Sequence, residues 1–257
     1  MKKILLKLVI VVVVLLAAAI AFAFLSLNRI VKKGVETVGP QVTKVSITLD
    51  SVNLSVLSGQ GTIKGMVIGN PEGYKTESAI RMGEATLQLA PKSLLTDKIV
   101  VNKINVVAPE ITFEGSLKGS NLTKLLANVE EFTASLPSQG SGKAGGGGAS
   151  KRLQVDAFSI TGAKVNLSMD MLGGKKMSVP LPDIHLENLG AGPEGITAGE
   201  LVKQVLSVVV QSTTKEVAGA LGKLGEGATE AVKDIGKGAT EGVKKATEGI
   251  KSLFKKR

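Results

Sequence analysis

The feature that most constrains this chain is an uninterrupted apolar stretch near its beginning. The twenty consecutive residues from Leu8 to Leu27 carry no charge, and Ser26 is their one polar member. As a helix this stretch would be about 30 Å long, which matches the hydrocarbon core of a bilayer. A helix is the expected form because lipid offers no partners for free backbone N–H and C=O groups. We therefore expect residues 1–33 to be a transmembrane anchor with basic flanks.

The alternative interpretation of this stretch is a cleaved signal peptide. Lys2 and Lys3 would form its basic n-region, and Ala21-Phe22-Ala23 offers a cleavage site made of small residues. The apolar run is longer than the usual h-region of about 7–15 residues, and this length favours a retained anchor. Basic residues flank both ends of the run, so the charge pattern alone does not set its orientation.

After the anchor, alternating apolar and polar residues predict a β-rich domain. Aromatic residues make up 3% of the chain and cysteine is absent, so the core has to be built from Val, Ile, Leu and Ala. The β-branched members of that set favour strands. Helical spacing replaces the alternation from Asn121 to Glu130, with Ser120 as a candidate N-cap. The period of two recurs over residues 43–56, 62–68, 80–89, 99–107, 111–113 and 155–189.

A Gly/Ser-rich segment divides the β pattern into two blocks. Residues 135–152 cannot bury enough apolar surface to order themselves, so we expect a flexible linker. A phosphate-binding loop at Gly140-Ser141-Gly142-Lys143 is the sharper alternative. It lacks the first glycine of that motif and has Ala144 where Ser or Thr is needed. The predicted organisation is a first β block over 34–134 and a second over 153–195.

Four segments of these blocks carry a resemblance to a known family. They read GNPEGY, KIVVNKINVVAPEITFEG, NLTKLL and, in the second block, LPDIHLENLG. Behind an N-terminal anchor, this order resembles AsmA-like proteins, which are relatives of TamB and of the bridge-like lipid-transfer proteins. The similarity covers about residues 30–129 and 153–206. It implies one interrupted α+β domain with a strongly curved, mostly antiparallel sheet, whose apolar concave face is open to acyl chains.

The same resemblance implies a location and a role. The expected protein is a single-pass protein of the bacterial inner membrane with a cytoplasmic N-terminus and its bulk in the periplasm. The expected function is non-catalytic lipid handling or organisation of the cell envelope. The candidate lipid-facing positions on the inward face of the strands are Val101, Ile104, Val106, Val165, Leu167 and Met169.

The C-terminal part of the chain changes to helical patterns. Residues 196–218 are expected to form a helix that begins with a capping box, Thr197 and Glu200. Over 219–257 the apolar residues recur every 11 positions, or about 3.67 per turn, which keeps them on one side of a nearly straight helix. Glycines weaken this helix in water. The predicted membrane-surface positions are Leu221, Leu224, Val232, Ile235, Val243, Ile250 and Phe254, with Lys233, Lys244 and Lys245 beside them.

This C-terminal repeat resembles the 11-residue repeats of synucleins and late-embryogenesis-abundant proteins. We expect the apolar side of this helix to bind a membrane surface. The alternatives are that it packs on the protein's own sheet or that the segment is disordered. The net charge of +10 favours an anionic partner. Scarce aromatic residues argue against stacking on single-stranded nucleic acid, so we expect a phospholipid or membrane surface and no nucleic acid.

Residues for catalysis or metal binding are sparse. Asp183, His185 and Glu187 alternate on one strand, but neighbours two apart lie about 6.6–6.8 Å apart, and a solvated strand face gives the same pattern. We expect no enzyme activity, cofactor or metal. The alternative function is that of a tethered structural or stress protein whose C-terminal helix binds or protects membranes. An open concave face would favour lipid handling, and a face covered by the protein's own helices would favour the alternative.

Overall fold

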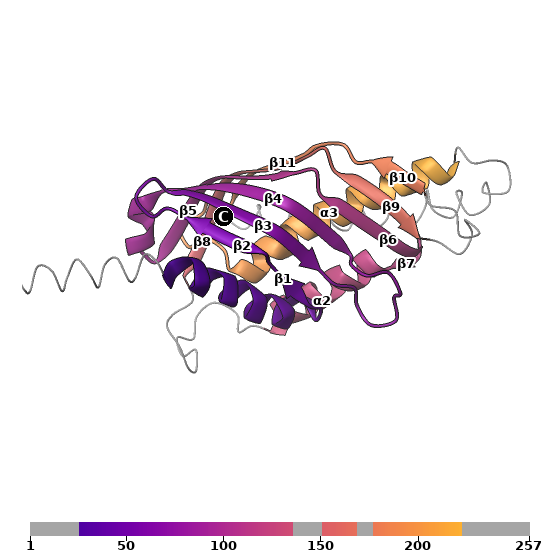
Figure 1. Ribbon diagram of the computed structural model, residues 1–257, viewed down its shortest axis with the longest axis horizontal. Helices are drawn as coiled ribbons and strands as arrows, with labels where there is room; N and C mark the ends of the chain where they lie inside the picture. Colours follow the sequence, from indigo (N-terminus) through magenta and orange to yellow (C-terminus); the bar gives the residue numbers. More distant parts are fainter. Residues whose placement is uncertain (1–25, 136–150, 169–176, 223–257) are drawn as a thin grey trace, which may run out of the picture.

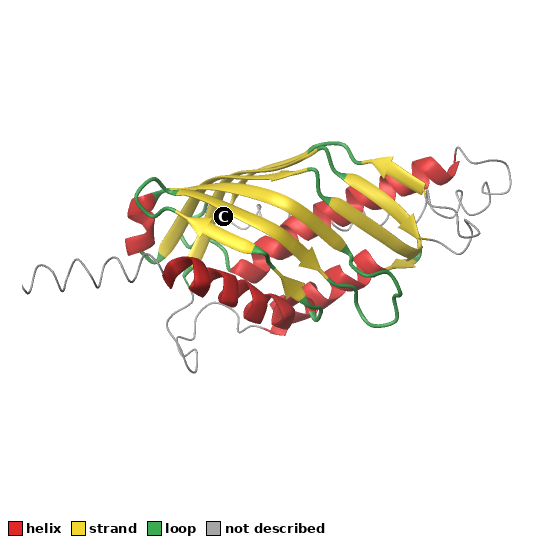
Figure 2. Cartoon of the chain, viewed as in Figure 1, coloured by secondary structure: helices red, strands yellow, loops and turns green. Residues whose placement is uncertain are grey.

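An 11-stranded mixed sheet organises the computed structural model, which describes residues 26–135, 151–168 and 177–222 (Figures 1 and 2). The helical elements are a helix over 26–43, η1 (Pro91–Leu95), α2 (Asn121–Ser135) and α3 (Ala198–Gly222). The strands are β1 (Ile47–Thr48), β2 (Ser51–Leu54), β3 (Gln60–Ile68), β4 (Ile80–Leu89), β5 (Lys98–Val107), β6 (Glu110–Ser116), β7 (Gly119–Ser120), β8 (Arg152–Thr161), β9 (Lys164–Ser168), β10 (Met177–Pro180) and β11 (Ile184–Leu189).

The two β blocks form one sheet through a parallel seam. β5 pairs with β8 and β6 with β9 in parallel, whereas the other strand pairs are antiparallel. This confirms the α+β class and the curved sheet. The predicted anchor lies almost wholly outside the described residues. Within the described ranges, no helix combines the length and apolar character that a membrane crossing requires.

The sheet curves because its strands bend at one common level. β5 and β6 are two parts of one bent segment, as are β8 and β9, and β10 and β11. Pairing continues through the bends, since Ala108 N donates to Thr161 O at 2.7 Å and Leu181 N donates to Ala163 O at 2.9 Å. We call this level the kink. Its residues are Asp50, Gly65, Gly83, Ala108–Pro109, Gly162–Ala163 and Leu181–Asp183.

Backbone conformation at the kink explains part of its sequence. Gly65 has φ of 61° and Gly162 has φ of 65°, which glycine adopts with little strain. A Cβ on Gly65 would also meet the side chain of Asp50. Between neighbouring bent segments, Gly162 N donates to the carboxylate of Asp183 at 3.0 Å. The result is a half-barrel whose concave face is apolar and whose convex face is polar.

The helix over 26–43 covers the sheet edge formed by β1 and β2. Leu54 N donates to Asn28 Oδ1 at 2.8 Å, and Leu49 N donates to Glu36 Oε1 at 2.9 Å. Lys32 Nζ bonds both to Glu36 and to the carbonyl of Leu49. These side chains satisfy backbone groups that an open edge would leave available to another chain. The helix is thereby fixed to the sheet along its length.

Helices α2 and α3 lie on the concave side. α2 packs on β6 and β7, and α3 packs on α2 and on β8 to β11 (Figure 1). The predicted caps are present at both N-termini. Thr123 N donates to Ser120 Oγ at 3.2 Å, and Thr197 with Glu200 forms the reciprocal bonds of a capping box. α2 continues five residues beyond the predicted end at Glu130, because Phe132 still packs on the core.

Candidate functional site

The predicted lipid-facing residues lie on the concave face, with Met169 outside the described residues. Val101, Val106, Val165 and Leu167 are buried there, and Ile104 is half-buried. Val101 and Ile104 are three residues apart and would face opposite sides of a regular strand. They share a face because the pairing of β4 with β5 shifts at Asn102. The structure therefore places the described candidates on one surface but gives them different degrees of cover.

One part of this surface is fully covered by the protein's own helices. Ile111 pairs with Val165 and Phe113 with Leu167 across the β6–β9 seam, and these side chains are at most 5% exposed. We call these four residues the covered patch. The α2 side chains packed over the patch are also fully buried: Leu122, Leu125 and Val129. Two of the predicted lipid-facing residues, Val165 and Leu167, therefore pack against protein.

A second part of the concave face, on the other side of the kink, is only half-buried. Leu87 of β4 lies opposite Ile104 of β5, and Leu89 lies opposite Val101. The half-buried large apolar residues of this region form what we call the open patch: Ile63, Leu87, Leu89, Ile99 and Ile104. Apolar residues of α3, including Leu201, Val205 and Val208, are half-buried as well. The open patch is the described surface that best fits the predicted contact with acyl chains.

A polar network holds the far end of the covered patch. The buried Asn121 at the start of α2 donates from Nδ2 to Asn70 Oδ1 at 2.7 Å and to Thr112 O at 2.8 Å. Asn70 in turn bonds to Thr76, whose N–H donates to Glu114 Oε2 at 2.8 Å. We call these side chains the asparagine lock. Asn70, Glu114 and Asn121 lie in the segments GNPEGY, KIVVNKINVVAPEITFEG and NLTKLL, but no local pattern in these segments predicts their contacts.

Glu114 is the charged member of the asparagine lock. Burial of its carboxylate opposes ionisation, but hydrogen bonds from the Thr76 side chain and from the N–H groups of Lys75 and Thr76 outweigh that effect. Together they hold the pKa of Glu114 below its ordinary value of 4.5. The loop after β3 is thereby tied to β6 by an ionised group at neutral pH.

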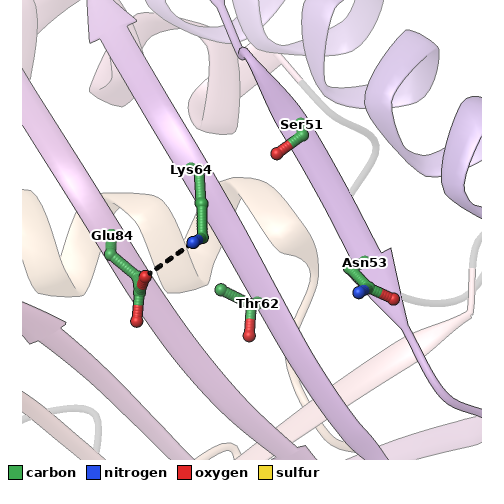
Figure 3. A pocket seen from close by; sticks show the side chains of 5 residues that line it. All are labelled: Ser51, Asn53, Thr62, Lys64 and Glu84. Carbon is green, nitrogen blue, oxygen red and sulfur yellow. Dashed lines mark ion pairs between the residues drawn. The ribbon is translucent and has the colours of Figure 1, made fainter.

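Two hollows of the described surface are lined by polar side chains and lie on the convex face. The larger one, of about 430 Å³, is lined by Ser51, Asn53, Thr62, Lys64 and Glu84. Figure 3 shows Lys64 of β3 reaching toward Glu84 of β4, and their Nζ–Oε2 distance is 3.3 Å. Both side chains are about half exposed, so this ion pair is weak. The hollow offers neither an apolar cavity nor a buried charge to a ligand.

The metal-competent sequence D-x-H-x-E is dispersed by the fold. Asp183 belongs to the kink, where its carboxylate accepts the hydrogen bond from Gly162. His185 and Glu187 are exposed on the convex face of β11. Within residues 26–135, 151–168 and 177–222, no three His, Asp or Glu side chains gather as a metal site would require.

The predicted C-terminal repeat is described only at its start. Leu221 is buried near the end of α3, which runs without a break across residue 218. The other predicted membrane-surface residues, from Leu224 onward, lie outside the described residues, as does the linker over 136–150.

Comparison with models of known protein families gave no match, and neither did comparison with curated proteins. The likeness to AsmA-like proteins and that of the C-terminal repeat to synucleins therefore stay expectations from the sequence.

Proposed function

We propose that this protein is a membrane-tethered, non-catalytic lipid-handling protein that holds an acyl chain against the open patch. The observation that carries the proposal is that the covered patch and the open patch of one apolar concave face are buried to different extents. Half-buried Leu87, Leu89 and Ile104 leave apolar surface that a hydrocarbon chain can cover. The N-terminal apolar stretch supports the same proposal, because it would hold this surface beside a source of phospholipid.

The fold suits this role in a second respect. α3 packs on β8 to β11, so one side of the concave face is permanently covered while β3, β4 and β5 keep half-buried side chains. A lipid tail there would lie between the sheet and the apolar side chains of Leu201 and Val205. We further propose the topology implied by the family resemblance, with the bulk of the chain in the periplasm of a bacterial envelope.

Lipid analysis of the purified full chain tests the proposal. The variant carrying Leu87→Asp and Ile104→Asp is expected to lose most of its co-purifying phospholipid, because two charges would replace apolar contacts. The matched control carries Thr86→Asp and Asn105→Asp on the opposite face of the same strands, and it should retain lipid. Both proteins must keep a cooperative unfolding transition. Equal lipid content in the two variants, or no lipid in the parent protein, would contradict the proposal.

The covered patch favours a second candidate function, that of a tethered structural protein. In this case α2 and α3 complete the core, and the predicted repeat over 219–257 attaches to a membrane surface. Full chain reconstituted in one vesicle population should then cluster a second, anionic population. Val232→Asp with Val243→Asp should abolish clustering, whereas Thr229→Asp with Thr240→Asp should reduce it little. Clustering unaffected by either pair would contradict this candidate.

A further inference from the structure

Three exposed apolar side chains gather at one end of the molecule. Among the described residues, the large apolar side chains with the greatest exposed fractions are Leu95 at 92%, Leu57 at 86% and Ile30 at 64%. Leu57 lies in the turn between β2 and β3, Leu95 ends η1, and Ile30 belongs to the helix over 26–43. Figure 1 shows the β2–β3 turn, η1 and the start of this helix at the same end, on the left of the view. We call the three residues the apolar tip.

The backbone that carries the apolar tip is held in place by the sheet. Leu89 N donates to Gly59 O at 2.6 Å, which ties the β2–β3 turn to the end of β4. The same turn contacts the start of η1, since a Cβ on Gly59 would lie 3.2 Å from Pro91 Cδ. On the other side, the bond from Leu54 N to Asn28 joins the turn to the helix. The tip is thus a fixed surface and not a set of independent loops.

The apolar tip lies close to the end of the expected anchor. The apolar stretch ends at Leu27, one residue before Asn28, whose side chain bonds to Leu54. Leu57 is three residues further along, which spans at most about 10 Å of extended chain. The headgroup region adds about 5–8 Å on each side of the hydrocarbon core. A chain that leaves the core at Leu27 would therefore bring Leu57 close to the headgroups.

The charges around the apolar tip favour an anionic surface. Lys151 Nζ donates to the carbonyl of Leu94 beside Leu95, so its charge is held at this end. Asp97 and Glu194 are exposed acidic side chains of the same end, and Glu200 there lies 3.8 Å from the guanidinium group of Arg152. The exposed basic side chains there are Arg29, Lys33, Lys92 and Lys151. Basic residues next to exposed leucines are the combination that binds the interface of an anionic membrane.

We propose that the apolar tip inserts into the headgroup layer of an anionic phospholipid membrane. The membrane is the one that carries the anchor, so this inference rests on the tether in the proposed function but not on lipid contact at the open patch. Insertion would set the half-barrel upright on the surface with its tip end down. The loop after β3 would then point away, because the nine residues of β3 extend about 30 Å.

The chain has no cysteine, so single cysteines can report on each position without background. Leu57→Cys, Leu95→Cys and, as the control, exposed Glu72→Cys in the loop after β3 would each carry an environment-sensitive fluorophore. The full chain is reconstituted in vesicles of phosphatidylcholine and phosphatidylglycerol that contain lipids with a quencher near the headgroup. We expect the lipid quencher to remove most of the fluorescence at 57 and 95 and little at 72. Iodide in the water should quench the probe at 72 strongly and the probes at 57 and 95 weakly.

A charge variant separates insertion from mere proximity. With the fluorophore at 95, Leu57→Asp should reduce quenching by lipid, whereas Ser51→Asp on the exposed face of β2 should not. The protein could float with the vesicles while iodide reaches the probes at 57 and 95 as readily as the probe at 72. That result would overturn insertion of the apolar tip and leave the tether. Probes shielded from both quenchers would indicate a protein partner and also overturn it. Failure of the chain to float would overturn the tether and docking together.

Discussion

The covered patch and the open patch lie on one concave face and are built from the same kinds of side chain, but only one is completed by the protein itself. Ile111 and Ile104 belong to the two parts of one bent segment, β5 and β6. Ile111 is 1% exposed beneath α2, whereas Ile104 is half-buried on the other side of the kink. A surface that merely stabilised the fold would gain from being covered throughout. The difference therefore separates a part that supports the fold from a part that, under the proposed function, a lipid tail would cover.

The largest expected effect comes from truncating matched residues in the two patches. Ile111→Ala should destabilise the full chain by about 2–5 kcal/mol, because it leaves a cavity under α2. Ile104→Ala should cost about 1 kcal/mol, since less apolar area leaves contact with protein. Thermal unfolding in detergent micelles, followed by circular dichroism, measures the difference. Equal losses of stability would mean that the two patches are covered alike.

The asparagine lock should matter next. Asn121→Ala leaves the part-buried N–H of Glu114 and the Oδ1 atom of Asn70 without these partners, which costs about 1–3 kcal/mol. The loop over 70–78 should also become more sensitive to limited proteolysis. Asn53→Ala, on the exposed convex face of β2, is the matched control and should change neither property. A loop that remains protected in Asn121→Ala would show that the lock does not hold it.

The kink that separates the patches offers a sharper pair of variants. Gly65→Ala should destabilise the protein by about 1–3 kcal/mol, because φ is 61° and the new Cβ would meet Asp50. Gly83→Ala lies at the same level in the neighbouring strand, where nothing lies within 4 Å of an added Cβ. It should change stability by at most about 0.5 kcal/mol. Urea unfolding of the two variants measures the difference, and similar losses would remove the proposed role of Gly65.

The smallest expected effect is a dependence on pH. Because the pKa of Glu114 is lowered in the folded state, its contribution is fully present above its ordinary value of 4.5 and is lost as the pH falls through the folded pKa. The hydrogen bond from Lys32, with one from Leu49 N, lowers the pKa of Glu36 in the same sense. Glu114→Gln should therefore flatten the acid branch of a plot of stability against pH and leave the neutral branch level. An unchanged acid branch would contradict the assignment.

Local patterns predicted much of the fold. The period of two located the strands, and Ser120 and Thr197 marked the starts of α2 and α3, because strands and caps depend on neighbouring residues. The candidate lipid-facing residues that the structure describes also share one face of the sheet. Sequence spacing could not show that β5 would pair with β8 in parallel, since the register of distant strands is set by tertiary packing.

The division of the candidate site could not be derived for the same reason. Val165 and Ile104 follow the same alternating pattern, yet Val165 is fully buried and Ile104 is only half-buried, a difference that depends on tertiary packing. The asparagine lock joins Asn70 to Asn121 across 51 residues, and no local signal predicts such a contact. The shift at Asn102, which puts Val101 and Ile104 on one face, likewise depends on pairing with β4.

The most direct test of the account is photo-crosslinking of lipid to selected positions of the sheet. A photoreactive residue is placed in the full chain, reconstituted in phospholipid vesicles, at Ile104 and Leu87 of the open patch. Asn105 on the opposite face and Val165 of the covered patch serve as controls. The account predicts phospholipid adducts at Ile104 and Leu87, and none at Asn105 or Val165. Adducts at Val165 equal to those at Ile104, or an absence of adducts at all four positions, would contradict it.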